Sequence, residues 1–304
     1  MLVKRLPKLF ALSLLLIAAL AACQPTEIIT QEIELDSGDI TTYARITGPA
    51  EAEELLIAIN GGPGLSSHYM ASLEKLADSD LAVLTYDQRG TGRSSRPANV
   101  VSNFELAEYT ADLEALRQEF GYEKINLLGH SWGGILAMHY TIMHPGRVSS
   151  LVLTGSGPPT RAAIEAGQNS FTDRVRQLQD EGVIPRSLPT DGTEQLATIL
   201  PAYFADPSFP FQPGEAEYIE NDDTTNQLSW KALGDYDLTA EIGRLSMPVL
   251  ILWGKQDPFG LPMAYATRDA FTGTEVDFIL LDQCGHFWHE CEEEFLDQAA
   301  TFLK

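Results

Sequence analysis

The pentapeptide Gly129-His130-Ser131-Trp132-Gly133 constrains the fold of this chain more than any other feature. Residues 125–128 before it are apolar and β-favouring, whereas residues 135–140 after it have a helical composition. A turn that joins such a strand directly to a helix is tight, so the positions two before and two after Ser131 must lack side chains, and both are glycine. The pattern predicts a strained turn that presents Ser131 as a nucleophile at a helix N-terminus. A plain strand-to-helix loop is the alternative.

Continuous apolar runs alternate with helical patterns along most of the chain, which predicts an α/β fold with a mostly parallel sheet flanked by helices. Eight strands are expected: a hairpin within 32–46, and runs at 55–59, 81–86, 125–128, 151–154, 248–253 and 276–281. Between 157 and 245 prolines are frequent and only amphipathic helical fragments appear, which indicates an inserted helical cap. The predicted organisation is a signal peptide at 1–22, a tether at 23–30, core parts at 31–156 and 246–304, and the cap at 157–245.

The N-terminal residues predict export and lipid anchoring. Basic residues precede an apolar run over 9–22 that is too short for a comfortable membrane span. The run ends in Leu20-Ala21-Ala22-Cys23, which resembles the bacterial lipoprotein box and implies that Cys23 is lipidated. Gln24 implies onward sorting to an outer membrane where the cell has one. We therefore expect the chain in the bacterial cell envelope, outside the cytoplasm. An ordinary cleaved signal or an uncleaved anchor is the alternative.

Acidic residues outnumber basic ones by 43 to 20, for a net charge of −23. A surface of this sign repels nucleic acid and anionic lipid head groups, so we expect no nucleic-acid partner. The sequence contains no P-loop and no dinucleotide fingerprint, and we expect no cofactor. The expected partner is a small molecule or a short peptide, and the sequence does not indicate an oligomeric state.

Two further residues follow late apolar runs in the order that a serine nucleophile requires. These are Asp257 and His286. In this arrangement His286 removes the proton of Ser131, and Asp257 orients the imidazole and stabilises its charged form. The alternatives are an Asp-Pro turn without a catalytic role at Asp257, and His289 as the base. Gly285 lets the loop aim His286, so His286 is preferred.

An acyl-transfer site also needs two fixed N–H donors for the oxyanion. Trp132 offers one because it begins the helix after the serine. Gly62 offers the other from the loop after the 55–59 run, where a missing side chain lets the backbone approach the substrate. A flexible turn over 61–64 is the alternative.

Cys284 and Cys291 remain once Cys23 is assigned to lipid. An even pair in an oxidising compartment suggests a disulfide, and two reduced core cysteines are the alternative. The same stretch contains His286 and His289. Two cysteines and two histidines together have the composition of a zinc site. Structural zinc sites usually draw their ligands from two separated pairs, so we expect no metal here.

Three motifs together resemble the α/β-hydrolase superfamily, and most of all its proline iminopeptidase branch. They are Asn-Gly-Gly-Pro-Gly at 60–64, Asp-Gln-Arg-Gly-Thr-Gly-Arg-Ser at 87–94 and Gly-His-Ser-Trp-Gly-Gly at 129–134. The resemblance covers both core parts and leaves the cap unmatched. It implies a serine hydrolase that releases N-terminal proline, or a similar small residue, from peptides through an acyl-enzyme. The alternatives are an esterase, lactonase or amidase for a small metabolite, or a non-catalytic ligand-binding lipoprotein.

The sequence departs from this branch where the substrate would bind. Members of the branch hold the free amino terminus with carboxylates from the cap and from just after the catalytic aspartate. Here Pro258 follows that aspartate, the cap lacks the usual Trp-Glu signature, and Asn60 replaces the usual histidine. The cap carboxylates that would pair with an ammonium group are Glu215, Glu217, Glu220, Asp222 and Asp223. A solvated face of an acidic protein is the alternative.

Overall fold

The computed structural model describes residues 26–212 and 219–304. Cys23, Glu215 and Glu217 lie outside these ranges, so the predicted lipid anchor and two of the candidate cap carboxylates have no structural account. Within the described ranges, no helix is both long enough and apolar enough to cross a membrane.

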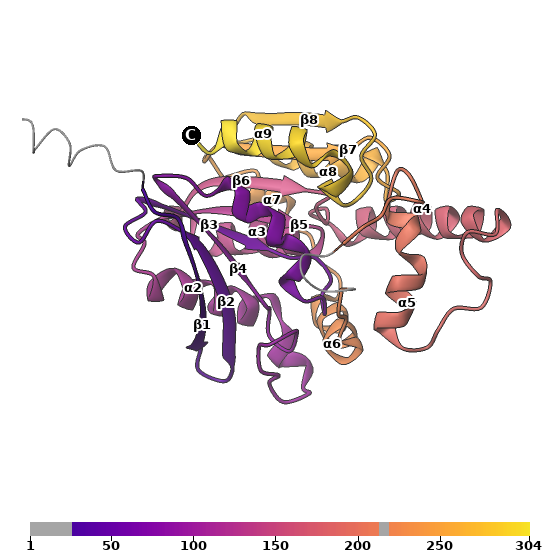
Figure 1. Ribbon diagram of the computed structural model, residues 1–304, viewed down its shortest axis with the longest axis horizontal. Helices are drawn as coiled ribbons and strands as arrows, with labels where there is room; N and C mark the ends of the chain where they lie inside the picture. The colour runs from indigo at the N-terminus through magenta and orange to yellow at the C-terminus, as the bar shows by residue number, and fades with distance from the viewer. Residues whose placement is uncertain (1–25, 213–218) are drawn as a thin grey trace, which may run out of the picture.

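A single eight-stranded sheet forms the centre of the molecule (Figure 1). Its strand order is β1-β2-β4-β3-β5-β6-β7-β8; the β1–β2 and β2–β4 pairs are antiparallel, and all other pairs are parallel. This confirms the predicted fold class. The strands are β1 Ile29–Asp36, β2 Thr41–Gly48, β3 Glu54–Ile59, β4 Leu81–Tyr86, β5 Ile125–His130, β6 Val148–Thr154, β7 Val249–Gly254 and β8 Val276–Leu281.

Helices flank this sheet on both faces (Figure 1). The α-helices are α2 Leu106–Glu119, α3 Trp132–Met143, α4 Arg161–Asp180, α5 Gly192–Ile199, α6 Asp223–Leu233, α7 Thr239–Ile242, α8 Leu261–Ala270 and α9 Glu292–Phe302. The 3₁₀ helices are η1 Ser67–Leu76, η2 Val101–Phe104, η3 Pro145–Arg147, η4 Leu200–Tyr203 and η5 Trp288–Cys291.

The central strands bury side chains on both faces, which explains their continuous apolar runs. Successive side chains of a strand point to opposite faces, so Leu55 and Ile57 of β3 pack into one hydrophobic cluster while Leu56 and Ala58 pack into another. The first cluster includes residues of α2, α3 and α8, and the second includes residues of η1 and α9. The sheet therefore lies between two apolar layers.

One predicted helix is interrupted near its start. The periodicity predicts a helix from about 103 to 120, but Glu105 is extended, with φ −71° and ψ 152°, and separates η2 from α2. A tertiary contact holds this turn: the buried Arg89 guanidinium donates a hydrogen bond of 2.7 Å to the Asn103 carbonyl and two of 2.8 Å to the Asp112 carboxylate. Arg89 thus ties its loop to a carboxylate.

The described part of the segment between β6 and β7 contributes α4 to α7 and no strand. Its residues 220–222 lie against the loop that follows β3. Leu65 forms an isolated β-bridge with Asn221, and the Ser66 N–H donates a 3.1 Å hydrogen bond to the Glu220 carbonyl. The segment therefore contacts a loop that also lines the site described next. Its boundaries at 157 and 245 stay a prediction.

Candidate active site

Ser131 lies between β5 and α3 in a backbone conformation that is rare for a residue with a side chain. Its φ is 53° and its ψ is −122°. A Cβ atom at Gly133 would come within 2.1 Å of the Ile59 carbonyl oxygen, and one at Gly129 within 2.6 Å of the Gly133 carbonyl oxygen. The two glycines are therefore required by close backbone approach, which is the physical basis of the pattern in the sequence.

His286 and Asp257 are joined by a hydrogen bond of 2.9 Å between Nδ1 and Oδ2. Because a carboxylate only accepts hydrogen bonds, His286 carries a proton on Nδ1, and Nε2 is its second nitrogen. The other Asp257 oxygen accepts from the Phe259 N–H at 2.9 Å. Asp257 thus both begins a turn and orients the imidazole, and both side chains are buried.

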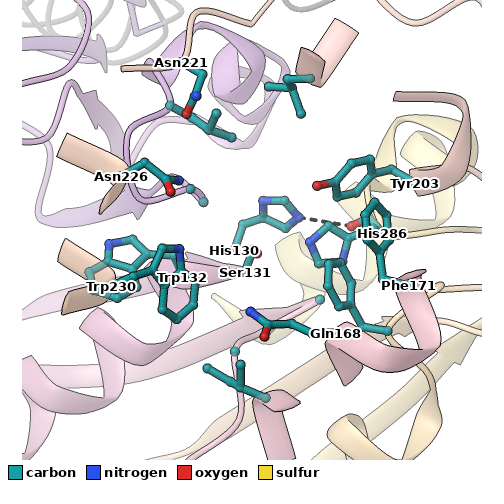
Figure 2. Close-up of a pocket in the computed structure, with 18 of the residues that line it drawn as sticks. His130, Ser131, Trp132, Gln168, Phe171, Tyr203, Asn221, Asn226, Trp230 and His286 are labelled. Atoms are coloured by element: carbon teal, nitrogen blue, oxygen red, sulfur yellow. Dashed lines mark hydrogen bonds between the residues drawn. The ribbon is translucent and has the colours of Figure 1, made fainter. Parts of the chain in front are cut away.

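Ser131 and His286 line the same cavity, whose volume is about 330 Å³ (Figure 2). Three residues that come from distant parts of the sequence therefore converge at one site. Among the described residues, neither the Ser131 hydroxyl nor the Nε2 atom of His286 has a hydrogen-bond partner within the protein. Both groups are thus available to a substrate, and in an empty site a catalytic hydrogen bond is often longer than in a complex.

The competing histidine, His289, does not line this cavity. Its Nε2 atom hydrogen-bonds the Tyr69 carbonyl at 3.0 Å, and its Nδ1 atom is buried. Burial lowers the pKa of His289 to about 4, so this imidazole is neutral at pH 7. His289 is therefore a partly buried structural residue in this geometry.

The two candidate oxyanion donors, Gly62 and Trp132, also line the cavity. Trp132 is the first residue of α3, so its N–H has no intrahelical partner. The neighbouring Gly61 N–H donates to the Tyr69 hydroxyl and is already used. Gly62 has a φ of 128°, and its N–H has no hydrogen-bond partner among the described residues. These two N–H groups are placed to receive negative charge.

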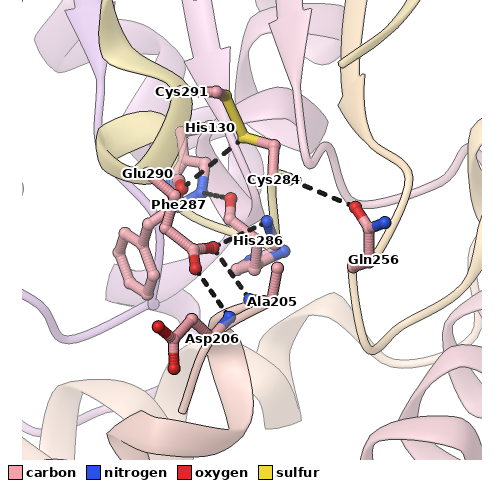
Figure 3. The surroundings of a disulfide bond; sticks show 10 residues. His130, Ala205, Asp206, Gln256, Cys284, His286, Phe287, Glu290 and Cys291 are labelled. Carbon is pink, nitrogen blue, oxygen red and sulfur yellow. Dashed lines mark hydrogen bonds between the residues drawn. A yellow bond between two sulfur atoms is a disulfide. The ribbon is translucent and has the colours of Figure 1, made fainter. Parts of the chain in front are cut away.

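The loop that carries His286 is closed by a disulfide between Cys284 and Cys291, whose Cα atoms are 5.6 Å apart (Figure 3). Since the two sulfurs bond to each other, neither is a thiolate ligand for zinc. Glu290, inside the same ring, accepts hydrogen bonds of 2.8 Å from the N–H groups of Gly285, Ala205 and Asp206. The sequence carries no signal for this role of Glu290, because its partners are backbone groups, two of them in a distant segment.

The three described cap carboxylates have different surroundings. Asp223 lines the cavity with Ser131, and its two oxygens accept hydrogen bonds from Gly192 N–H at 3.1 Å and from the Asn221 amide at 2.9 Å. Asp222 accepts from Thr225 N–H at 2.7 Å as the N-cap of α6, and it pairs with Arg96. Glu220 and Asp222 line a second cavity, of about 710 Å³. Only Asp223 of these three reaches the site.

The remaining cavity lining is mostly uncharged. It includes five aromatic rings, those of Phe171, Tyr203, Trp230, Phe259 and Phe287, and the side-chain amides of Gln168, Gln195, Asn221 and Asn226. Figure 2 shows Phe171, Tyr203 and Trp230 around the cavity. No lysine or arginine is among the described residues that line it. The cavity thus combines a reactive serine, a single carboxylate and an apolar wall. Apart from Asp223, its cap residues were missed in the sequence, because amphipathic fragments do not show where their helices lie over the sheet.

Comparison with known proteins places this chain in a family. A family model described as the alpha/beta hydrolase fold matches residues 54–292. A proline iminopeptidase from Lactobacillus delbrueckii subsp. bulgaricus is 30% identical over 272 residues, which cover 83% of this chain and 90% of that protein. One from Lactobacillus crispatus is 27% identical over 279 residues, covering 86% and 94%. The crystal structure of a Mycobacterium smegmatis proline iminopeptidase has the same fold, with a TM-score of 0.66 and 22% identity, and covers 90% of this chain and 97% of that chain.

The family model spans well over half of the sequence, and each of the two relatives matches more than four fifths of it. This chain is therefore a hydrolase that belongs to the α/β-hydrolase family, in its proline iminopeptidase-like branch.

Proposed function

We propose that this protein is a serine hydrolase that acts through an acyl-enzyme, with Ser131 as nucleophile, His286 as base and Asp257 as the group that orients it. One observation supports this most: the cavity that holds Ser131 also holds an imidazole whose far nitrogen is fixed by a buried carboxylate at 2.9 Å. A weakly nucleophilic hydroxyl needs such a base, and a base needs such an orienting group.

The reaction follows from these positions. The Ser131 oxygen attacks the substrate carbonyl while its proton passes to His286 Nε2, and the oxyanion accepts hydrogen bonds from the Gly62 and Trp132 N–H groups. As the bond from the carbonyl carbon to the leaving group breaks, His286 gives its proton to that group. Water then attacks the acyl carbonyl while His286 Nε2 takes a proton from the water. The ester bond to Ser131 breaks, and His286 gives this proton to the Ser131 oxygen.

For the substrate, we propose peptides with a free N-terminal proline or a similar small residue. The relatives named as proline iminopeptidases support this choice. Asp223 supports it as well, since it is the one acidic side chain among the described residues that line the cavity with Ser131. A carboxylate in a pocket whose described residues include no lysine or arginine pairs with an ammonium group, and it disfavours substrates in which that charge is blocked.

The test compares proline p-nitroanilide with its N-acetyl form. We expect kcat/KM to fall at least roughly 10-fold on acetylation, because the charge-assisted hydrogen bond to Asp223 is lost. Asp223→Asn should lower kcat/KM for the free amine by a similar factor and should change kcat/KM for the N-acetyl substrate little. Glu220→Gln is the matched control, since Glu220 lines the second cavity. If acetylation leaves kcat/KM unchanged in the wild-type enzyme, the aminopeptidase proposal is wrong.

The second candidate is an esterase or amidase for a small uncharged metabolite. One observation favours it: both Asp223 oxygens already accept hydrogen bonds within the protein, from Gly192 and Asn221. A carboxylate engaged in this way has less to offer an ammonium group. If this alternative holds, Ser131 turns over acyl esters and Asp223→Asn does not change the rate. N-acetylation of proline p-nitroanilide then does not change its kcat/KM either.

We also propose that the protein is held in the cell envelope by lipid on Cys23, facing away from the cytoplasm. The sequence Leu20-Ala21-Ala22-Cys23 after an apolar run supports this. In a bacterial host, the full-length chain should incorporate labelled palmitate and sediment with membranes, whereas Cys23→Ser should lose the label. Wild-type protein that carries no label would overturn the lipid proposal without affecting the catalytic one.

A further inference from the structure

We infer that Tyr69 and His130 are positioning residues, which form one hydrogen-bonded bridge between the oxyanion loop and the loop of the base. The inference rests on the proposed acyl-enzyme function, because it concerns how two parts of that site are held in register. Neither side chain is assigned a step in the reaction above.

The bridge is continuous through three contacts. The Gly61 N–H donates to the Tyr69 hydroxyl, which lies 2.8 Å from His130 Nδ1. His130 Nε2 lies 3.0 Å from the carbonyl oxygen of His286, the contact drawn as a dashed line in Figure 2. One end of the bridge is thus next to the Gly62 donor, and the other end is the backbone of the base itself.

The chemistry of the end groups fixes the direction of every hydrogen bond. A carbonyl oxygen only accepts, so His130 carries its proton on Nε2 and donates to His286. His130 Nδ1 is then an acceptor and takes the hydroxyl proton of Tyr69. The Tyr69 oxygen keeps lone pairs and accepts from Gly61 N–H. All groups are satisfied in one arrangement only, and this makes the bridge geometrically specific.

The surroundings keep both side chains neutral. Tyr69 and His130 are almost fully buried, and burial lowers the pKa of His130 and raises that of Tyr69. His130 packs against His286 and Phe287 with ring centroids 4.8 Å and 5.2 Å apart. With both nitrogens engaged, His130 is not a second base for Ser131, although it precedes the serine directly.

The bridge matters because its two ends act at the same moment of the reaction. The oxyanion donor and the imidazole must both be placed within a fraction of an ångström when the tetrahedral centre forms. Their loops are more than two hundred residues apart in sequence, and β5 carries His130 between them. Removing a link should therefore affect the transition state more than substrate binding.

The experiment is a double-mutant cycle on kcat and KM for an activated acyl ester, with Tyr69→Phe, His130→Asn and the double variant. Tyr140→Phe is the matched control: it too removes a buried hydroxyl, one that donates to Glu114 at 2.7 Å and does not line the cavity. Active-site titration counts the folded enzyme in each sample, so kcat refers only to competent molecules.

We expect kcat to fall roughly 10- to 100-fold in each single variant, with KM within about twofold of the wild-type value. The double variant should lose little more than the worse single variant, because one broken link already disconnects the bridge. A boronic-acid inhibitor, which mimics the tetrahedral state, should lose affinity in parallel with kcat.

Three results would overturn the inference. The first is a kcat of Tyr69→Phe equal to that of Tyr140→Phe, and the second is a double variant in which the two single losses of kcat multiply. The third is a loss of folding in all three bridge variants, which would give Tyr69 and His130 a purely structural role. Failure of the proposed function is a different result. In that case wild-type protein would show no turnover that depends on Ser131.

Discussion

Acid pH acts on the stability of this molecule through individual histidines. His289 has a pKa of about 4 in the folded protein, below its ordinary 6.5, because burial disfavours its charged form. Between these two values the unfolded chain binds more protons than the folded one. The free energy of unfolding should therefore fall as pH drops from about 6.5 to about 4, and His289 should contribute about 3 kcal/mol to that loss.

Urea unfolding at pH 8 and pH 5 measures this contribution. In His289→Gln, the side-chain amide keeps a donor for the Tyr69 carbonyl but does not titrate, so the loss between the two pH values should be smaller than in the wild-type protein. An equal loss in both proteins would mean that His289 is not responsible. The deeper His130, whose pKa burial also lowers, should account for part of the remaining loss.

At the same scale, some residues of the site can be predicted from sequence and others cannot. Ser131 is predictable because its turn demands glycines at 129 and 133, and this demand is local. Tyr69 is not predictable. Its hydroxyl forms hydrogen bonds with a backbone N–H and with His130 of β5. A single tyrosine in a helical pattern does not indicate such partners.

Among the elements, the loop between β8 and α9 has the strongest local constraint. The disulfide of Cys284 and Cys291 closes a short ring that contains His286. Replacing both cysteines with serine should lower the free energy of unfolding by roughly 2 kcal/mol, since the unfolded chain regains the freedom that the ring removes. It should also lower kcat, because the loop of His286 loses its covalent constraint and keeps only hydrogen bonds. These join His286 to Asp257, His130 and Tyr203, and Gly285 to Glu290.

The measurement compares the double serine variant with wild-type protein, each with and without dithiothreitol. Reductant should bring the wild-type enzyme to the kcat of the variant and leave the variant unchanged. If the variant matches the oxidised wild-type protein in both stability and kcat, the disulfide does not support this loop.

Elements differ in how far sequence reveals them. The inner parallel strands β3 to β7 can be predicted because both faces of each are covered by apolar layers, which leaves a long apolar run. The start of α2 cannot be predicted in this way, because Arg89 from another loop binds the Asn103 carbonyl just before the helix. The helices of the inserted segment have short apolar stripes, so the sequence indicates that they exist. It does not indicate where they lie over the cavity.

For the whole molecule, the cavity is a joint product of the sheet and the inserted segment. The Asp222 N–H donates to the Gly64 carbonyl at 2.8 Å, and the Asn226 amide donates to the Pro63 carbonyl at 2.6 Å. These contacts place the start of α6 on the loop that offers the Gly62 donor. The same contacts therefore position the cap residues that line the cavity and the loop of the Gly62 donor. No local sequence pattern predicts these contacts, because they join distant segments.

If Ser131 forms an acyl-enzyme with the help of His286, the acyl group can be trapped on the protein. Mass spectrometry of protein quenched during turnover of a slowly deacylating ester detects it. We expect one acyl group per molecule on the peptide that contains Ser131, none in Ser131→Ala, and acylation slowed by several orders of magnitude in His286→Ala. An acyl group on another residue, or acylation as fast in His286→Ala as in the wild-type protein, would contradict this mechanism.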